Sequence, residues 1–450
     1  MRIINILLLL FILALPSRSQ TPRLLITTDI GGDPDDQQSL VRLMVYTNEF
    51  DIEGFICSAS GTPGELGKAV TRPDLVGEII AGYRQVYPNL LKHDAKFPLP
   101  DRLMSVVKSG NPNRGWENVG DGHDSEGSEW IIKIVDKKDN RPLNISIFGG
   151  QTDLAQALWK VKSSRPVKKY QQFISKIRVY DINDQDHIFG MIHKEHPSLF
   201  YILAKSPEGI DKREGAYRGI YLGGNESLTS MAWLKENVLE DHGPLGKLYP
   251  TKTWTAPNPH GIMKEGDTPS WFFFLNNGLN SSDHPEYGGW GGRFVRNEKG
   301  YYSDAVDSFQ NEQSARATVY RWRDDFQRDW AARMDWCVKD HAACNHPSTI
   351  SVNGSSSKKQ IVIKKKAGRV IELNATSSTD PERDSLQYEW MIYPESGIGS
   401  EKIVLKTDQQ KAFVKIPVLK NSKGIFLVLK VTDNGNPNLT SYNRINLISN

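Results

Sequence analysis

The chain has 450 residues, a formal net charge of +3 and 38% hydrophobic residues. This length exceeds a single ordinary hydrophobic core, so we expect two domains. The nearly balanced charge lacks the basic footprint of a nucleic-acid-binding protein, and we expect no nucleic-acid partner.

The first twenty residues differ in composition from the rest of the chain. Arg2 precedes the short apolar run IINILLLLFILAL, and the small residues of SRS follow it. This order is typical of a secretory signal peptide, the alternative being a retained anchor. We therefore expect residues 1–20 to be removed from an exported protein of the periplasm or the medium. No later segment holds about 18 uninterrupted apolar residues, so we expect no membrane attachment after cleavage.

Strand-like and helix-like patterns alternate from residue 21 to residue 345. Short apolar runs predict strands at 23–29, 52–59, 143–150 and 174–182. Amphipathic patterns predict helices at 35–50, 74–91, 152–164 and 311–341. Apolar strands separated by helices are typical of a parallel, Rossmann-like sheet with helices on both faces. In such an α/β domain, ligands bind beyond the carboxyl ends of the strands.

A second domain follows the Pro-, Gly- and Ser-rich stretch NHPSTISVNGSSSKK. Residues 349–450 alternate with period two and carry turn residues, which predicts an all-β, immunoglobulin-like sandwich. We expect Trp390 to be a core residue of this sandwich. The odd number of three cysteines excludes a disulfide framework, although Cys337 and Cys344 could pair in an oxidising compartment.

Four aspartates, at positions 29, 33, 35 and 36, lie where the first predicted strand gives way to a helix. One aspartate could serve only as a helix cap, but a cap needs a single side chain. Clustered carboxylates repel one another, and a bound cation is the simplest compensation. Oxygen ligands favour Ca²⁺, with Mg²⁺ the less expected ion. The glycine and late glutamate of an EF-hand are missing, and Thr27 stands where an aspartyl-phosphate enzyme has its nucleophile.

The same segment resembles the signature of nucleoside hydrolases, Asp-x-Asp-x-Gly-x-Asp-Asp after a strand. Asp29 matches the second Asp of the signature, and Asp35 and Asp36 match the closing pair with two extra loop residues. Thr27 replaces the first Asp. ISIFGGQTDLAQAL resembles a second motif of the family, and GIMKEGDTPSWFFFL resembles a third, with Gly266 in place of the family's His.

The resemblance implies which residues hold the metal. They are Asp29, Asp36, Asp267 and the backbone carbonyl of Thr152. Asp35, beside them, is expected to act as the general base that takes a proton from water.

Several further residues are expected to bind the substrate. Thr62 stands where the family has a ribose-facing Asn, and His123 lies in the loop DGHDSEGS. Asn183 and Asp186 come from YDINDQDHIFG, the region of the family's ribose-binding loop. Trp290, in HPEYGGWGGRF, could stack on a sugar ring, the alternative being that this loop packs its aromatics inward.

DGHDSEGSEWI, NGLNSSDHPEYGGWGGRF and VTDNGNPNLTSYNR resemble a subfamily of secreted bacterial proteins. These proteins join a nucleoside-hydrolase-like domain to a C-terminal sandwich, and some are described as cellulose-binding. The resemblance implies a Ca²⁺-dependent hydrolase of N-glycosyl or related glycosidic bonds. Its partner would be a small molecule or oligosaccharide that contains a sugar, with a polysaccharide as a further partner.

The alternative is a protein that binds carbohydrate, such as cellulose, without catalysis. Two features discriminate between these readings. A pure binder has no need of a spare carboxylate such as Asp35. A row of exposed aromatics in the sandwich would favour the binder, and the residues available for it are Tyr388, Trp390, Tyr393 and Tyr442. The sequence leaves the oligomeric state open.

Overall fold

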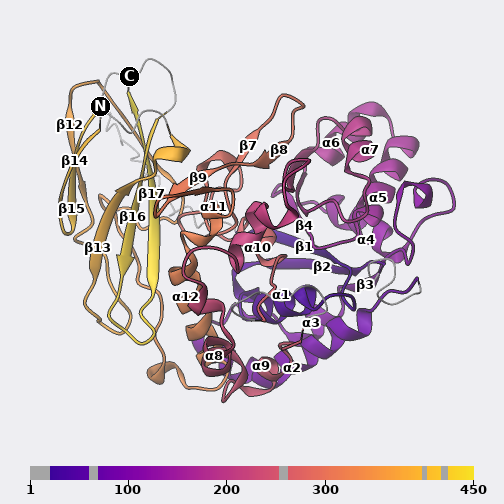
Figure 1. The fold of residues 1–450 in the computed structure, drawn as a ribbon, viewed down its shortest axis with the longest axis horizontal. Coiled ribbons are helices and arrows are strands. Elements are labelled where there is room, and N and C mark those ends of the chain that lie inside the picture. Colours follow the sequence, from indigo (N-terminus) through magenta and orange to yellow (C-terminus); the bar gives the residue numbers. More distant parts are fainter. Residues whose placement is uncertain (1–20, 60–68, 253–261, 398–402, 417–423, 450) are drawn as a thin grey trace, which may run out of the picture.

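The computed structural model describes residues 21–59, 69–252, 262–397, 403–416 and 424–449. An α/β domain and a β-sandwich lie side by side in it, with the sandwich drawn in gold and yellow in Figure 1. Among these described residues, no helix combines the length and the apolar character that a bilayer span requires.

The α/β domain is built on an eight-stranded sheet with the order β3-β2-β1-β4-β5-β6-β8-β7. Its strands are β1 (Arg23–Thr28), β2 (Asp51–Cys57), β3 (Val107–Ser109), β4 (Leu143–Ile147), β5 (Ile177–Ile182), β6 (Phe200–Ala204), β7 (Phe294–Arg296) and β8 (Tyr302–Asp304). All neighbouring strands are parallel except β7, which pairs with β8 in the antiparallel sense. The predicted parallel sheet is therefore confirmed, and all four predicted strands occur in it.

Helices cover both faces of this sheet (Figure 1). One face carries α1 (Asp35–Met44), α2 (Pro73–His93), α3 (Pro100–Met104), α8 (Met231–Leu234), α9 (Gly243–Lys247), α10 (Thr268–Phe272), α11 (Ala317–Tyr320) and α12 (Arg323–Trp336). The other carries α4 (Glu126–Val135), α5 (Gln151–Ser164), α6 (Val167–Ile174) and α7 (Phe189–Glu195). Adjacent residues of β1 point to opposite faces, so Leu24 joins one hydrophobic core and Leu25 the other.

The prediction of one helix over 311–341 is wrong in its extent. The stretch begins with β10 (Glu312–Ser314), which pairs with β9 (Asp307–Phe309), and the chain is helical only in α11 and α12. The expected apolar face is nevertheless buried, because Val319, Trp322 and Phe326 all lie in the core.

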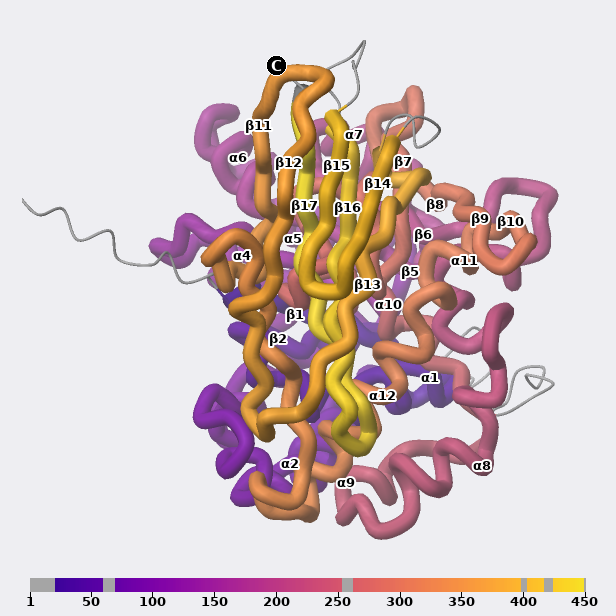
Figure 2. The backbone as a smooth tube through the Cα atoms, turned by 90° about the vertical axis from the view of Figure 1, so that its left-hand side faces the viewer, coloured from indigo at the N-terminus to yellow at the C-terminus, as the bar shows by residue number. Residues whose placement is uncertain are grey.

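The sandwich contains a four-stranded sheet, β11-β17-β16-β13, and a three-stranded sheet, β12-β15-β14. Figure 2 shows them one behind the other, in front of the α/β domain. The strands are β11 (Ile361–Lys365), β12 (Val370–Asn374), β13 (Gln387–Ile392), β14 (Val404–Asp408), β15 (Lys411–Lys415), β16 (Ile425–Thr432) and β17 (Thr440–Ser449). Trp390 is 7% exposed and packs among apolar residues of both sheets, which confirms its predicted core position.

Polar and aromatic contacts join the sandwich firmly to the α/β domain. The carboxylate of Asp325 on α12 accepts a hydrogen bond from the Tyr442 hydroxyl and pairs with Lys430 at 2.9 Å. Arg444 is 1% exposed and donates to the carbonyls of Leu279 and Gly288, both at 2.8 Å. The two domains therefore share a buried, hydrogen-bonded interface.

This interface corrects the expectation for Trp290. Its side chain is 3% exposed, and its Nε1 donates to the hydroxyl of Tyr442 at 3.3 Å. Its ring meets that of Tyr442 edge to face, with 6.2 Å between centroids. The ring is used to dock the sandwich, so it cannot stack on a sugar. Cys57, Cys337 and Cys344 are buried free thiols.

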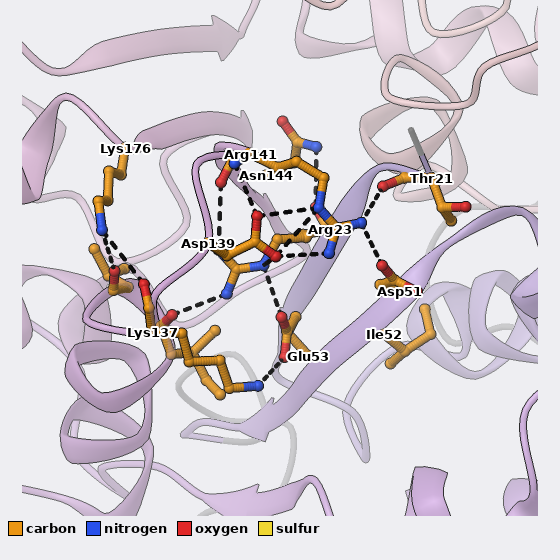
Figure 3. A network of polar contacts seen from close by, with 12 residues as sticks. Thr21, Arg23, Asp51, Ile52, Glu53, Lys137, Asp139, Arg141, Asn144 and Lys176 are labelled. Carbon is orange, nitrogen blue, oxygen red and sulfur yellow. Dashed lines mark hydrogen bonds and ion pairs between the residues drawn. The ribbon is translucent and has the colours of Figure 1, made fainter. Parts of the chain in front are cut away.

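A buried ion network closes the amino end of β1 and β2 (Figure 3). Arg23 is fully buried, and its Nε donates to the Glu53 carboxylate at 2.7 Å. Lys137 donates to the second oxygen of Glu53 at 2.5 Å. Burial alone would raise the pKa of Glu53, but these hydrogen bonds outweigh it and lower the pKa below its ordinary value of 4.5.

We expect Glu53→Gln to destabilise the fold by about 3 kcal/mol, because it leaves the buried Arg23 with only the more distant Asp139 carboxylate, at 3.7 Å, as a counter-ion among the described residues. Urea unfolding measures this loss. Because the folded pKa of Glu53 is depressed, its stabilising contribution is complete above about pH 4.5 and is lost as the pH falls through the lowered value. The variant should lack that acid-side dependence. Asp51→Asn is the control, since Asp51 is half-exposed and should cost less than about 1 kcal/mol.

Candidate functional site

The site lies at the carboxyl end of β1, where the chain continues to β2 on one side of β1 and β4 lies on the other side. In open α/β sheets this divergence leaves a crevice at the carboxyl ends of the strands. Asp29 follows β1 directly, and Gly149 follows the end of β4. A side chain at position 149 would overlap the Asp29 carboxylate, so this glycine allows the close approach.

The turn from β1 to α1 brings two further aspartates to this crevice. Gly31 adopts a φ of 109°, a left-handed conformation that favours glycine. Asp35 and Asp36 then occupy the first turn of α1, where the helix dipole favours carboxylates. The Thr28 hydroxyl accepts a hydrogen bond from the backbone N–H of Ile30 and donates to Asp36, which fixes the turn.

Asp267 reaches the same crevice from a segment more than 200 residues later in the chain. Helix α1 holds this segment through Gln38, whose side chain accepts from the Lys264 N–H at 2.7 Å. A second anchor is the fully buried ion pair between Arg42 Nε and Glu265 Oε2, at 2.6 Å. The helix that carries Asp35 and Asp36 therefore also positions Asp267.

The three carboxylates form a tight cluster, in which Asp36 and Asp267 are buried and Asp35 is half-buried. Asp35, Asp36 and Asp267 each offer an oxygen, and these oxygens lie within 4.8 Å of one another. Burial, with the Asp29 and Asp35 charges, raises the pKa of Asp36 well above its ordinary value. Burial and the three neighbouring aspartates do the same to Asp267. Burial, Asp33 and Asp29 raise the pKa of Asp35 to about 7, against the opposing charge of Arg218.

These residues fit a hard divalent cation. Asp267 is 1% exposed, and its Oδ2 has no hydrogen-bond partner among the described residues. A buried carboxylate oxygen without a partner costs free energy that a metal ligand bond would remove. Carboxylates, together with water, are the ligands that Ca²⁺ accepts. Asp36 and Asp267, with Asp29 or Asp35 beside them, are the residues that would hold it.

Asp29 lies beside this cluster and also contacts a cation of the protein. Arg114 Nη2 lies 3.3 Å from Asp29 Oδ2, and Arg114 Nε lies 4.0 Å from Asp186 Oδ1. The charge of Asp29 and a side-chain hydrogen bond with it both raise the pKa of Asp36, so these two carboxylates are neighbours. Whether Asp29 or Asp35 is the further ligand stays a prediction. Arg114 was missed in the sequence, because an isolated arginine in a loop carries no spacing signal.

Thr152 is the second residue of α5, at the amino end of the helix that follows β4, and the role of its carbonyl as a metal ligand stays a prediction. Its backbone N–H and its hydroxyl both donate to Asp186, at 2.8 and 2.7 Å. Through these two bonds Asp186 caps the start of α5. Asp186 is linked to the edge of the site by Arg114, which contacts both Asp186 and Asp29.

The other substrate-binding predictions remain untested. Asn183 lies at the end of β5 in a left-handed conformation with a φ of 71°, and its backbone N–H donates to the carbonyl of Ala204. The loop of His123 is held along α5 by Gln156, whose side chain bonds both backbone groups of Gly120. Thr62 lies outside the described residues.

Two more cations near the cluster were missed in the sequence. Arg218 lies in a 3₁₀ helix (Ala216–Ile220), donates to the Tyr221 hydroxyl and lowers the pKa of Asp35. Lys264 is 6% exposed and interacts with the charges of Asp33 and Asp35. Neither lies in a segment with a periodic pattern, so no local signal marked them.

Comparison with known proteins gives a consistent result. The family model described as "Cellulose-binding Sde182, nucleoside hydrolase-like domain" matches residues 23–294, and that of "Cellulose-binding protein Sde0182, C-terminal domain" matches residues 370–448. A solved structure from Saccharophagus degradans, titled as a nucleoside hydrolase-related hypothetical protein associated with carbohydrate metabolism, is 33% identical. The match covers 96% of this chain and 100% of that one, with a TM-score of 0.80.

Titin domain M7, at 11% identity over 24% of this chain and 96% of its own, has a TM-score of 0.15. The endo-fucoidan hydrolase MfFcnA9, at 12% identity over 95% and 80%, has a TM-score of 0.18. These two scores are too low to support an argument. The comparison with curated proteins found no match.

Proposed function

Because the chain belongs to the family of cellulose-binding Sde182 proteins with a nucleoside hydrolase-like domain, we propose that it is a calcium-dependent hydrolase of N-glycosyl or related glycosidic bonds. The observation that carries the proposal is the cluster of Asp35, Asp36 and Asp267 at the carboxyl end of β1, with one buried oxygen of Asp267 left without a partner.

Each residue of the cluster has a role in this reaction. Asp36 and Asp267 are the two most buried carboxylates of the cluster, and they hold the ion. When bound, Ca²⁺ orients sugar hydroxyls and favours deprotonation of water. Asp35 is only half-buried and can reach a substrate, so it takes the proton of the attacking water. Negative carboxylates beside the sugar also stabilise the positive charge of an oxocarbenium-like transition state.

Calcium titration by calorimetry, with sugar release assayed in the same samples, tests this proposal. The chain from residue 21 should bind one Ca²⁺ in this site and release sugar from a nucleoside or glycoside only when calcium is present. Asp267→Asn should weaken binding at least 100-fold and abolish release, because Asp267 supplies a buried ligand. Asp211→Asn is a control, since Asp211 is exposed and pairs with Arg213. Sugar release by the Asp267→Asn variant in the absence of calcium would overturn the proposal.

The second candidate is a carbohydrate-binding protein without catalysis, and two observations favour it. The family descriptions name cellulose. A cavity of about 390 Å³ also lies between the domains, where Asn276, Asn277, Asp329 and Asn443 offer groups that can bond sugar hydroxyls. The aromatics of the sandwich do not contribute an exposed row, since Trp390, Tyr393 and Tyr442 are buried and Tyr388 is half-buried. Retention on cellulose without sugar release from any substrate would favour this candidate.

A further inference from the structure

Three histidines and a glutamate meet at the junction of the two domains, away from the aspartate cluster. His93 is the last residue of α2, and His341 opens a 3₁₀ turn (His341–Ala343) after α12. His346 lies in the segment that leads into the sandwich, and Glu382 lies in a turn of the sandwich itself. Nitrogens of His341 and His346 and an oxygen of Glu382 lie within 4.8 Å of one another.

A chain of hydrogen bonds decides which ring nitrogens carry protons. His93 Nε2 lies 3.0 Å from the carbonyl oxygen of Lys339, which can only accept, so His93 Nε2 carries a hydrogen. The Nδ1 of neutral His93 is then an acceptor, and it lies 2.9 Å from His346 Nε2. His346 must therefore donate from Nε2. We assign these protons from the partners, as is usual for histidine.

This assignment leaves two acceptors facing each other. In neutral His346 the Nδ1 carries a lone pair, and it lies 2.7 Å from Glu382 Oε1. A lone pair and a carboxylate oxygen repel at this distance unless a cation lies with them. That cation is either a proton, carried by His346 Nδ1 or by Glu382, or a metal ion.

We propose that His346 Nδ1, Glu382 and His341 bind a divalent transition-metal ion of the zinc class. Two imidazoles and one carboxylate form a ligand set that zinc accepts, with water in the fourth position. His341 is exposed and stacks on the His346 ring with 3.9 Å between centroids. One of its nitrogens already lies within 4.8 Å of the His346 nitrogen and the Glu382 oxygen.

The surroundings of His346 resemble those of a metal ligand. A metal-bound histidine usually donates its other ring N–H to a fixed acceptor, which sets the tautomer and the ring orientation. His346 does so through His93, which is in turn held by Lys339. The ring is also stacked against Trp336, with 5.0 Å between centroids.

The proposed ion would cross-link the two domains. His341 lies at the end of the α/β domain and His346 in the connection that follows it, whereas Glu382 belongs to the sandwich. Metal binding should therefore raise the thermal stability of the whole chain. This site is independent of the calcium proposal, because it shares no residue with it.

Titration of the metal-free chain from residue 21 with Co²⁺ and then Zn²⁺, in excess Ca²⁺, tests the proposal. One equivalent of Co²⁺ should give ligand-field absorption in the visible range, and one equivalent of Zn²⁺ should abolish it. Glu382→Gln and His346→Asn should each weaken binding at least 100-fold, and His341→Ala at least tenfold. Glu382 is exposed, so Glu382→Gln should fold normally.

A second His–Glu pair provides the matched control. His284 Nδ1 lies 3.2 Å from Glu286 Oε1, but the described residues place no third ligand with them. His284→Asn should leave both the stoichiometry and the affinity unchanged. Failure to bind an equivalent of either metal, or binding unaffected by Glu382→Gln, would overturn the proposal. In that event, nitrogen NMR should show His346 Nδ1 protonated, as a simple ion pair requires.

Discussion

Replacing Asp35 by asparagine should lower kcat for sugar release by about 10²–10⁴-fold, the range that a general base contributes. Its carboxylate is half-buried, and burial with Asp33 and Asp29 raises its pKa to about 7, near the value that suits proton transfer at neutral pH. Calcium affinity should fall no more than about tenfold, because Asp36 and Asp267 remain. Single-turnover kinetics and calorimetry on the same preparation measure both effects.

Asp33→Asn is the matched control for this prediction. Asp33 lies in the same turn and contributes to the electrostatic environment of Asp35, but it does not belong to the group of three carboxylates that could share a metal. Its replacement should change kcat by less than tenfold. If Asp35→Asn instead loses calcium as completely as Asp267→Asn, Asp35 is a ligand and another group must be the base.

Replacing Arg42 by methionine should destabilise the fold by about 3–5 kcal/mol, the cost of leaving a buried charge without its partner. Arg42 and Glu265 are both fully buried, and Arg42 NH2 also donates to Gln327 Oε1 at 2.7 Å. The guanidinium lies over the ring of Trp330, 3.8 Å from its centroid. Urea unfolding measures the loss, and Arg84→Ala at an exposed ion pair should cost less than about 1 kcal/mol.

The same replacement should also weaken calcium binding, which separates it from a purely structural defect. Arg42 lies on α1 with Asp36, and its partner Glu265 is two residues before Asp267. Without the Arg42–Glu265 ion pair, the segment that carries Asp267 loses an anchor to α1, the helix that carries Asp36. The double variant Arg42→Met, Glu265→Met should recover part of the stability, since no unpaired charge remains. An unchanged calcium affinity in folded Arg42→Met would contradict the positioning role.

The sequence predicted the site only in part. The aspartates next to β1 were found because four carboxylates in one turn are a local signal, and Asp267 was found through a family motif. Trp290 was placed wrongly in its role, because the sandwich covers its ring. The Thr152 carbonyl as a metal ligand stays a prediction. The signal peptide, the export and the calcium ion stay predictions.

The sequence by itself determined the α/β architecture, the parallel sheet, the sandwich and the family, because strand and helix periodicity, turn residues and motifs are local properties of the chain. Only the tertiary structure decided which charges meet. Arg114 reaches Asp29, Glu265 pairs with Arg42, and Glu382 meets His346. These partners are 36 to 223 residues apart, and their pairing depends on how the helices, the loops and the second domain pack.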